Sequence, residues 1–153
     1  MKDTTDKETI YFYKIADAYG HFSNFAKYPI KIKKQTFATT EHYFQAQKFV
    51  NTDVNHYNKI VNAAKPSIAA SLGRDRSKPL RKDWEAVKDN IMYEAIYAKF
   101  TQHDNLKELL LSTKDAKIVE ATTDDYYWGC GNDKSGKNML GVLLMRLRKE
   151  LST

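Results

Sequence analysis

The longest stretch with one continuous helical period constrains the fold most. Residues 84–100, WEAVKDNIMYEAIYAKF, follow Asp83, a residue type preferred at helix N-caps. At helical spacing much of one face is apolar, through Trp84, Val87, Ile91, Ala95, Ala98 and Phe100. A helix of this kind is stable mainly when other elements cover its apolar face. The sequence therefore predicts a globular fold built around a long helix.

Shorter patterns fill in the rest of the fold. Strands are expected at residues 9–15, 29–32, 35–37 and 117–122. Helices are expected from Thr40 as N-cap, from Asp53 through Ala64, at 67–72 between Pro66 and Gly73, at 104–111 and at 138–151. The prediction is an α+β fold over residues 1–153, a predominantly helical single domain with a small β-sheet.

Composition narrows the class of protein. With 153 residues and ten Tyr, the chain is long enough and aromatic enough to form a core. Cys130 stands alone, so it forms no internal disulfide, and no secretory signal opens the chain. No run reaches the ~18 apolar residues of a membrane span. We expect a soluble, intracellular (cytoplasmic) protein without a membrane partner, and a monomer.

The charge balance favours an anionic partner. The formal net charge is +6, which suits a nucleic acid or a phosphate-bearing ligand. Basic and acidic residues alternate along the chain, so a solvated basic surface explains the charge equally well. The segment GRDRSKPLRKDW (73–84) is read either as a solvated loop or as an edge that contacts phosphate.

Residues 37–50, FATTEHYFQAQKFV, raise the question of a helix with inward charges. Glu41, Phe44, Gln45 and Lys48 share one helical face. Glu41 and Lys48 lie about 10 Å apart along the axis at ~1.5 Å per residue, too far to neutralise each other. Either these side chains reach outward from the edge of the face, or they line a functional pocket.

A second candidate is the loop TTDDYYWGCGNDKSGKN (122–138). Its glycines allow close backbone approach to a ligand, its amides suit a phosphate, and its aromatics suit a base. A long loop fixed by a core tryptophan fits the pattern equally well. His21, His42, His56 and His103 have no metal-site spacing, so neither a metal nor another cofactor is expected.

Taken together, the motifs resemble the NADAR/YbiA-like family of N-glycosidases. The resemblance runs in order through YFY with YGHFSNF, TTEHYFQAQKF, LGR, DWEAVKDNIMYEAIYAKF, LLLST with IVEAT, WGCG and NMLGVLLMRLR. The chain departs from the family at KKQTF (33–37), where relatives often have a glycine turn. The resemblance implies hydrolysis of a bond between a phosphorylated ribose and the exocyclic amine of a nitrogen heterocycle.

The resemblance also implies roles for individual residues. Glu41 would stabilise the cationic sugar carbon, activate water or relay protons. Lys48 offers a further route, in which its amine attacks the sugar C1′ to form a Schiff base, and Asp125 would be a second acid or base. The implied substrate-binding residues are Asn24, Arg74, Trp84, Trp128, Gly129 and Asn138.

Three functions remain open at this point. The first is removal of ADP-ribose from guanine in nucleic acid, that is, reversal of DNA ADP-ribosylation, which the basic charge favours. The second is cleavage of ribosylamino-pyrimidine phosphates, the riboflavin intermediates. The third is a non-catalytic module that binds ADP-ribose or NAD. The expected partner is accordingly an ADP-ribosylated nucleic acid or a small phosphoribosyl substrate.

Overall fold

The computed structural model describes residues 8–153, which form two compact units. We call residues 8–23 with 103–153 the terminal unit and residues 24–102 the central unit. Six α-helices and two two-stranded sheets are found within the described residues. The α+β class is therefore as predicted, although the small sheet is two separate sheets.

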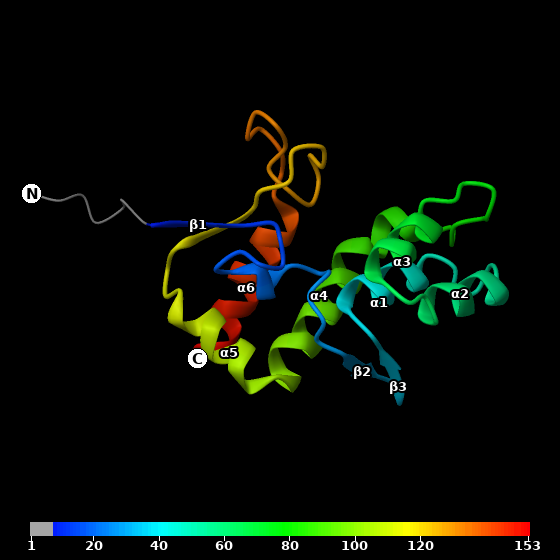
Figure 1. Ribbon diagram of the computed structural model, residues 1–153, viewed down its shortest axis with the longest axis horizontal. Coiled ribbons are helices and arrows are strands. Elements are labelled where there is room, and N and C mark those ends of the chain that lie inside the picture. The colour runs from blue at the N-terminus through cyan, green and yellow to red at the C-terminus, as the bar shows by residue number, and fades with distance from the viewer. Residues whose placement is uncertain (1–7) are drawn as a thin grey trace, which may run out of the picture. The chain divides into compact units, whose positions relative to one another are not determined.

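The terminal unit is built on a parallel strand pair (Figure 1). Strand β1 (Thr9–Phe12) pairs with β4 (Lys117–Glu120), in the register Thr9 to Lys117. Helix α6 (Met139–Leu151) packs on β4 and contacts α5 (Asp104–Ser112), and a short 3-10 helix η1 (Gly20–Phe22) precedes the central unit. Both strands end earlier than predicted, β1 at Phe12 and β4 at Glu120.

The loop between β4 and α6 closes on the start of α6. The carbonyl oxygens of Tyr127 and Trp128 accept hydrogen bonds from the backbone N–H groups of Met139 and Leu140, at 2.9 and 3.1 Å. Free N–H groups at a helix start need such acceptors. The WG turn therefore fixes the beginning of α6, which is Met139 rather than residue 138.

The central unit surrounds one short helix with three others. Helix α1 (Thr40–Gln47) packs against α2 (Val54–Val61), α3 (Pro66–Gly73) and α4 (Trp84–Gln102). The hairpin of β2 (Ile30–Ile32) and β3 (Gln35–Phe37) also contacts this group through α4 and α1. Because neighbours lie on several sides, seven of the eight residues of α1 are buried.

Capping residues set the helix boundaries in the central unit. Thr39, not Thr40, caps α1, with its hydroxyl oxygen accepting the His42 N–H at 3.1 Å. Asp53 caps α2 as predicted, although that helix ends at Val61 rather than Ala64. Helix α3 includes Pro66 and Gly73 as its first and last residues. The Asp83 carboxylate binds Arg81 instead of capping α4.

The β2–β3 hairpin turns at two lysines with left-handed backbones. Lys33 and Lys34 have φ of 51° and 69°, and Ile32 pairs with Gln35 across the two-residue turn. Turns of this kind normally contain Asn-Gly or Asp-Gly, because a side chain in this conformation crowds the backbone. The predicted hairpin is present, and its turn carries backbone strain.

Relief of this strain should stabilise the protein. We expect Lys33→Asn with Lys34→Gly to raise the free energy of unfolding by about 1 kcal/mol. Urea denaturation measures the change. The control is Lys31→Gly on the extended strand β2, which should instead lower stability by roughly 0.5–1 kcal/mol. An equal response to both changes would contradict the assignment of strain to the turn.

Candidate active site

Glu41 in α1 and Lys48 at its C-terminal end are both buried, as a pocket-lining pair would require. Glu41 is 9% exposed and Lys48 is 7% exposed. Lys48 follows the last residue of α1, and Arg81 holds this end of the helix by donating its backbone N–H to the Lys48 carbonyl oxygen at 2.9 Å. The inward charges predicted for this helix are therefore real, and neither side chain reaches into solvent.

Gln45 orients the Glu41 carboxylate. Its amide nitrogen donates to Glu41 Oε2 at 2.7 Å, one helical turn away. This amide orientation suits an ionised Glu41, because a carboxylate only accepts hydrogen bonds. Among residues 8–153, Gln45 Oε1 has no hydrogen-bond partner, and it points at Gly73, where a Cβ atom would meet it at 1.9 Å. Gly73 therefore leaves the room that Gln45 needs.

The Lys48 ammonium lies over an aromatic floor. Its Nζ is 5.7 Å from the ring centroids of both Phe44 and Trp84, and these two rings are 5.0 Å apart. The same nitrogen is 3.5 Å from the carbonyl oxygen of Gly73. Trp84, predicted to contact the substrate base, is buried here as part of this aromatic floor.

Burial makes Lys48 unusually easy to deprotonate. Desolvation, followed by repulsion from Arg76, lowers the pKa of the Lys48 amine from 10.5 to about 8, and attraction to Glu41 opposes this only in part. At pH 7 a group with this pKa is neutral in about one molecule in ten, far more often than an exposed lysine. A neutral amine of this kind is a nucleophile.

Two buried histidines hold the helices that frame the site. The His56 ring is 2.7 Å from the Leu72 carbonyl oxygen, which ties α2 to the last turn of α3 beside Gly73. The His42 ring lies between the Thr39 hydroxyl and the Ala63 carbonyl oxygen, at 2.8 and 2.9 Å. Both rings therefore have structural hydrogen bonds. Residues 8–153 contain no group of three or more His, Cys, Asp or Glu that could hold a metal ion.

The other two predicted residues of the central unit differ in their surroundings. Asn24 is buried and bonded on both sides of its amide, to the Thr40 hydroxyl at 2.8 Å and to the Met92 sulfur at 3.5 Å. It fixes the start of α1, and its contact with a substrate stays a prediction. Arg74 follows α3 and is exposed.

In the terminal unit, the predicted residues lie in the loop before α6. Asp125 accepts the backbone N–H groups of Tyr127 and Trp128 at 3.0 and 2.8 Å, and so shapes the WG turn. The Trp128 ring packs edge-on against Tyr127. The Gly129 carbonyl oxygen accepts the Asn138 N–H. The Asn138 amide bonds the β4 backbone at Glu120 and Ile118, at 2.9 and 2.8 Å, so it has a structural role.

Sequence reasoning missed several polar residues of the central unit. Gln45 appeared only as part of a helical face, although its place one turn from Glu41 was the available signal. Arg76 donates to the Gly73 carbonyl oxygen at 3.0 Å, and the basic run 73–84 had pointed to it. Lys99 is buried against Tyr28 and Phe100, which lowers the pKa of its amine to about 7.

Comparison with known proteins identifies the family of the chain. The fold and the site define a helix-rich α+β protein in which a lysine, Lys48, and a carboxylate, Glu41, are buried near each other's helical face. The chain belongs to the NADAR domain family, whose model matches residues 11–152.

Within residues 8–153, no helix combines the length and apolar character that crossing a membrane demands.

Three relatives illustrate the similarity. N-glycosidase YbiA of Escherichia coli is 53% identical over 99% of this chain and 91% of its own, and its NMR structure matches with a TM-score of 0.88 over 95% of this chain and 86% of that one. An N-glycosidase of Nostoc punctiforme is 48% identical over 94% of this chain and 92% of its own. The chloroplastic riboflavin biosynthesis protein PYRR of Zea mays is 42% identical over 93% of this chain but only 25% of its own.

The packing of Gln45 against Gly73 is directly testable. Gly73→Ala should lower the free energy of unfolding by about 1–3 kcal/mol, because the new methyl group displaces the amide that holds Glu41. In a Gln45→Ala background the same change should cost clearly less, because only the contact with the Cβ atom of residue 45, at 3.1 Å, remains. Thermal unfolding of the four proteins gives the coupling. If the two changes were additive, Gln45 would not be the obstacle.

The burial of Lys48 should reduce stability at neutral pH. The folded state holds the amine with a pKa of about 8, against 10.5 in the unfolded chain. Below pH 8 the buried ammonium therefore costs up to about 3 kcal/mol, and this cost falls as pH rises toward 10.5. Lys48→Met should accordingly be the more stable protein at pH 7, with a difference that shrinks between pH 8 and 10.5. Lys82→Met, an exposed neighbour, is the control and should show no such trend.

Proposed function

We propose that the protein is an N-glycosidase that hydrolyses the bond between a phosphorylated ribose and an exocyclic amine of a nitrogen heterocycle. The observation that carries the proposal is the buried Lys48 amine, with a pKa near 8, on a floor of Phe44 and Trp84. The names of the Escherichia coli and Nostoc relatives support the same reaction class. The single-domain organisation expected from the sequence stays a proposal, which the family match across both units supports.

Lys48 would act as the nucleophile. Protonation of the ring oxygen opens the sugar of a ribosylamine and leaves an iminium carbon at C1′. The neutral Lys48 amine adds to this carbon, a proton passes to the heterocycle's nitrogen, and the heterocycle leaves as its free amine. Water then adds to the Lys48–sugar iminium and releases ribose phosphate and the lysine. One water is consumed and the enzyme is unchanged.

Glu41 would serve the proton transfers of this sequence. Gln45 holds its carboxylate in place, and the distance between Glu41 and Lys48 along α1 leaves room for a sugar between them. A carboxylate beside C1′ stabilises the cationic carbon and takes or gives the protons that each step requires. Asp125 is proposed as a second acid or base. Its Oδ1 is occupied by two backbone N–H groups, which leaves Oδ2 for this purpose.

The names of the relatives favour a small substrate. The maize relative and a 34% identical protein of Vibrio vulnificus are both named as riboflavin biosynthesis proteins, so a ribosylamino-pyrimidine phosphate is the first candidate. The sequence alone had favoured ADP-ribosylated guanine in nucleic acid. That second candidate keeps the support of the net charge of +6. Both substrates join ribose to an exocyclic amine, and both require the same chemistry from Lys48.

Turnover and trapping test the proposal together. The purified protein is offered the ribosylamino-pyrimidine phosphate and, separately, DNA carrying ADP-ribosylated guanine, and release of the free base is measured. We expect turnover of the first, with kcat/KM rising toward a plateau above pH 8 as the Lys48 amine loses its proton. Borohydride should reduce the intermediate to a stable sugar adduct on Lys48, detectable by mass spectrometry.

Variants assign the individual roles. Lys48→Met should abolish trapping, and Glu41→Gln should lower kcat by roughly 10²–10⁴-fold. Asp125→Asn should slow the reaction, whereas Asp133→Asn should not. Asp133 is the matched control because it lies in the same loop and likewise accepts a backbone N–H, from Ser135. Full activity of Lys48→Met would exclude the covalent route. No turnover of either substrate, together with tight ADP-ribose binding, would leave the non-catalytic module.

A further inference from the structure

Three basic side chains, two arginines and a lysine, border the Lys48 amine. Arg76 Nη1 is 3.0 Å from the Gly73 carbonyl oxygen, the same atom that lies 3.5 Å from Lys48 Nζ. Arg74 adjoins Gly73 in the chain. Lys88 follows Trp84 by one turn of α4, so it lies on the face of the helix that meets Lys48. We call Arg74, Arg76 and Lys88 the basic cluster.

The acids of this region are engaged elsewhere. The Asp75 carboxylate accepts both the backbone N–H and the hydroxyl of Ser77, at 3.0 and 2.6 Å. The Asp83 carboxylate makes two bonds to Arg81, at 2.7 and 3.1 Å. Neither Arg74 nor Arg76 forms an ion pair with any acid among residues 8–153. Neither guanidinium group is therefore neutralised by a carboxylate of the described residues.

Lys88 differs from an ordinary surface lysine. Its side chain is only 17% exposed, whereas Glu85, which binds its ammonium at 2.7 Å, is 81% exposed. The exposed carboxylate neutralises the lysine weakly, because water competes for it. After desolvation, repulsion from all three cluster residues contributes to the lowered pKa of Lys48. Two of these cations, Lys48 and Arg76, share the Gly73 carbonyl oxygen, and the mutual repulsion of the four positive charges is relieved when an anion binds among them.

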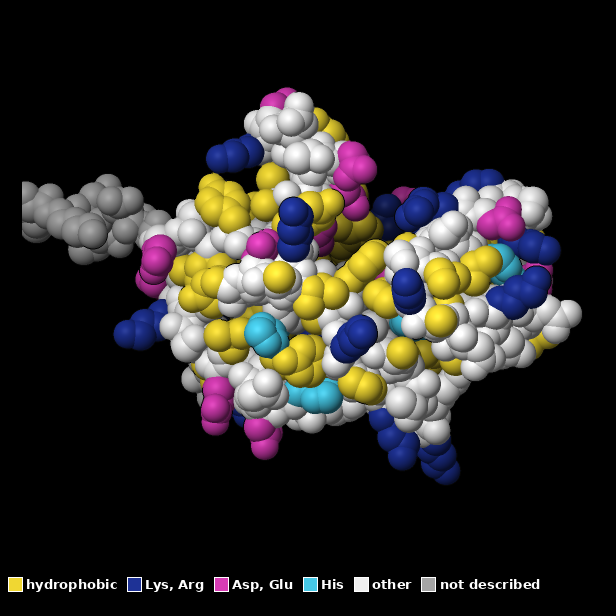
Figure 2. All heavy atoms as spheres, in the orientation of Figure 1, with side chains coloured by type: hydrophobic (Ala, Val, Ile, Leu, Met, Phe, Trp, Pro, Cys, Tyr) yellow, Lys and Arg dark blue, Asp and Glu magenta, His cyan; other side chains and the backbone are white. Residues whose placement is uncertain are grey.

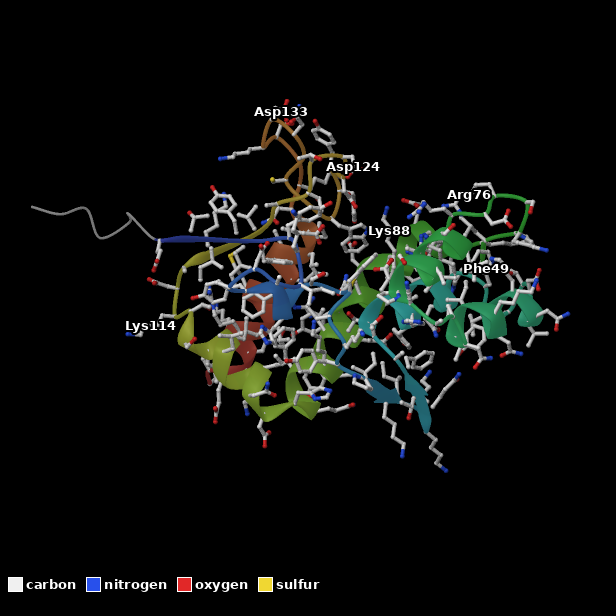
Figure 3. The ribbon with its side chains drawn as sticks, in the orientation of Figure 1. Phe49, Arg76, Lys88, Lys114, Asp124 and Asp133 are labelled. Carbon is white, nitrogen blue, oxygen red and sulfur yellow. The ribbon has the colours of Figure 1, made fainter. Side chains whose placement is uncertain are left out.

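We propose that Arg74, Arg76 and Lys88 form a binding site for the phosphate group that the substrate carries on its ribose. The inference rests on the proposed function and names the part of the substrate that this edge of the site recognises. Arginine forks match the oxygens of a phosphate, and a lysine adds a point charge. Figure 3 labels Arg76 on the segment after α3 and Lys88 on α4, and Figure 2 shows further Lys and Arg side chains around α2 and α3.

A phosphate bound at the basic cluster would orient the sugar. With the phosphate on the cluster, the ribose extends toward the Phe44–Trp84 floor, where Lys48 lies. The phosphate is thus recognised by groups that take no part in bond breaking. This arrangement is common to a ribosylamino-pyrimidine phosphate and to ADP-ribose, because both carry phosphate on the same sugar.

Calorimetric titration without turnover tests the inference. Ribose 5-phosphate should bind the wild-type protein, and unphosphorylated ribose should bind at least tenfold more weakly. Arg76→Gln and Lys88→Gln should each weaken binding of ribose 5-phosphate about tenfold or more, the scale of one lost charge-assisted hydrogen bond. Lys82→Gln removes the same charge from an exposed residue of the same segment and should change the affinity less than about twofold.

The outcomes separate this inference from the proposed function. Equal affinities of wild type, Arg76→Gln and Lys88→Gln for ribose 5-phosphate would overturn the phosphate site even if the enzyme turns over its substrate. Cluster-dependent binding with no turnover would support the phosphate site and count against the glycosidase. A parallel titration with ADP-ribose distinguishes the sources, because affinity well above that of ribose 5-phosphate indicates contacts to the second phosphate and the adenosine.

Discussion

The structure of the candidate site depends on one desolvated ammonium group. Lys48 is buried at the end of a helix that other helices surround, and it forms no ion pair with an acid of residues 8–153. Aromatic rings and a single carbonyl oxygen are poor substitutes for water. The neutral amine is favoured as a result, and its lowered pKa is the property on which the proposed nucleophilic role of Lys48 depends.

The surrounding residues follow from this constraint. Glu41 lies two turns away and is held by Gln45, so it raises the lysine's affinity for a proton only slightly. Gly73 brings a carbonyl oxygen to the amine and makes space for Gln45. The basic residues nearby repel the ammonium further, and they remain available to an anionic ligand. A direct Glu41–Lys48 ion pair would satisfy both charges and remove the reactivity.

Much of the fold was predictable because local signals were unambiguous. Asp53 caps its helix, Pro66 begins the next one, and the apolar period of residues 84–100 marks the longest helix. Predicted helix boundaries were wrong where two adjacent residues could both cap the helix, or where a contact with another part of the fold determined the conformation. Thr39 and Thr40 are the same residue type and either could cap α1, but Thr39 does. The Asp83 carboxylate binds the Arg81 guanidinium instead of the backbone at the start of α4. The Lys33-Lys34 turn has no local signal, since the pairing of β2 with β3 imposes its geometry.

The candidate site was predictable in part for a physical reason. Helical spacing alone places Glu41, Gln45 and Lys48 on one face, so their burial could be expected once that face was taken as internal. The spacing of residues along one helix does not determine which carbonyl oxygen or aromatic ring of another element a side chain contacts. The contacts of Asn24 and Asn138, and the approach of Arg76 to Gly73, therefore required coordinates.

Titration of the Lys48 amine by NMR is the most direct measurement of the central claim. Protein labelled with carbon-13 at the lysine Cε positions is followed from pH 6 to 11, and the Lys48 resonance is assigned by its loss in Lys48→Met. Lys99 provides an internal comparison, because its buried amine should titrate near 7. A midpoint near 8 for Lys48 is the predicted result. A midpoint near 10.5 would contradict it, since the amine would then be hydrated and protonated at neutral pH.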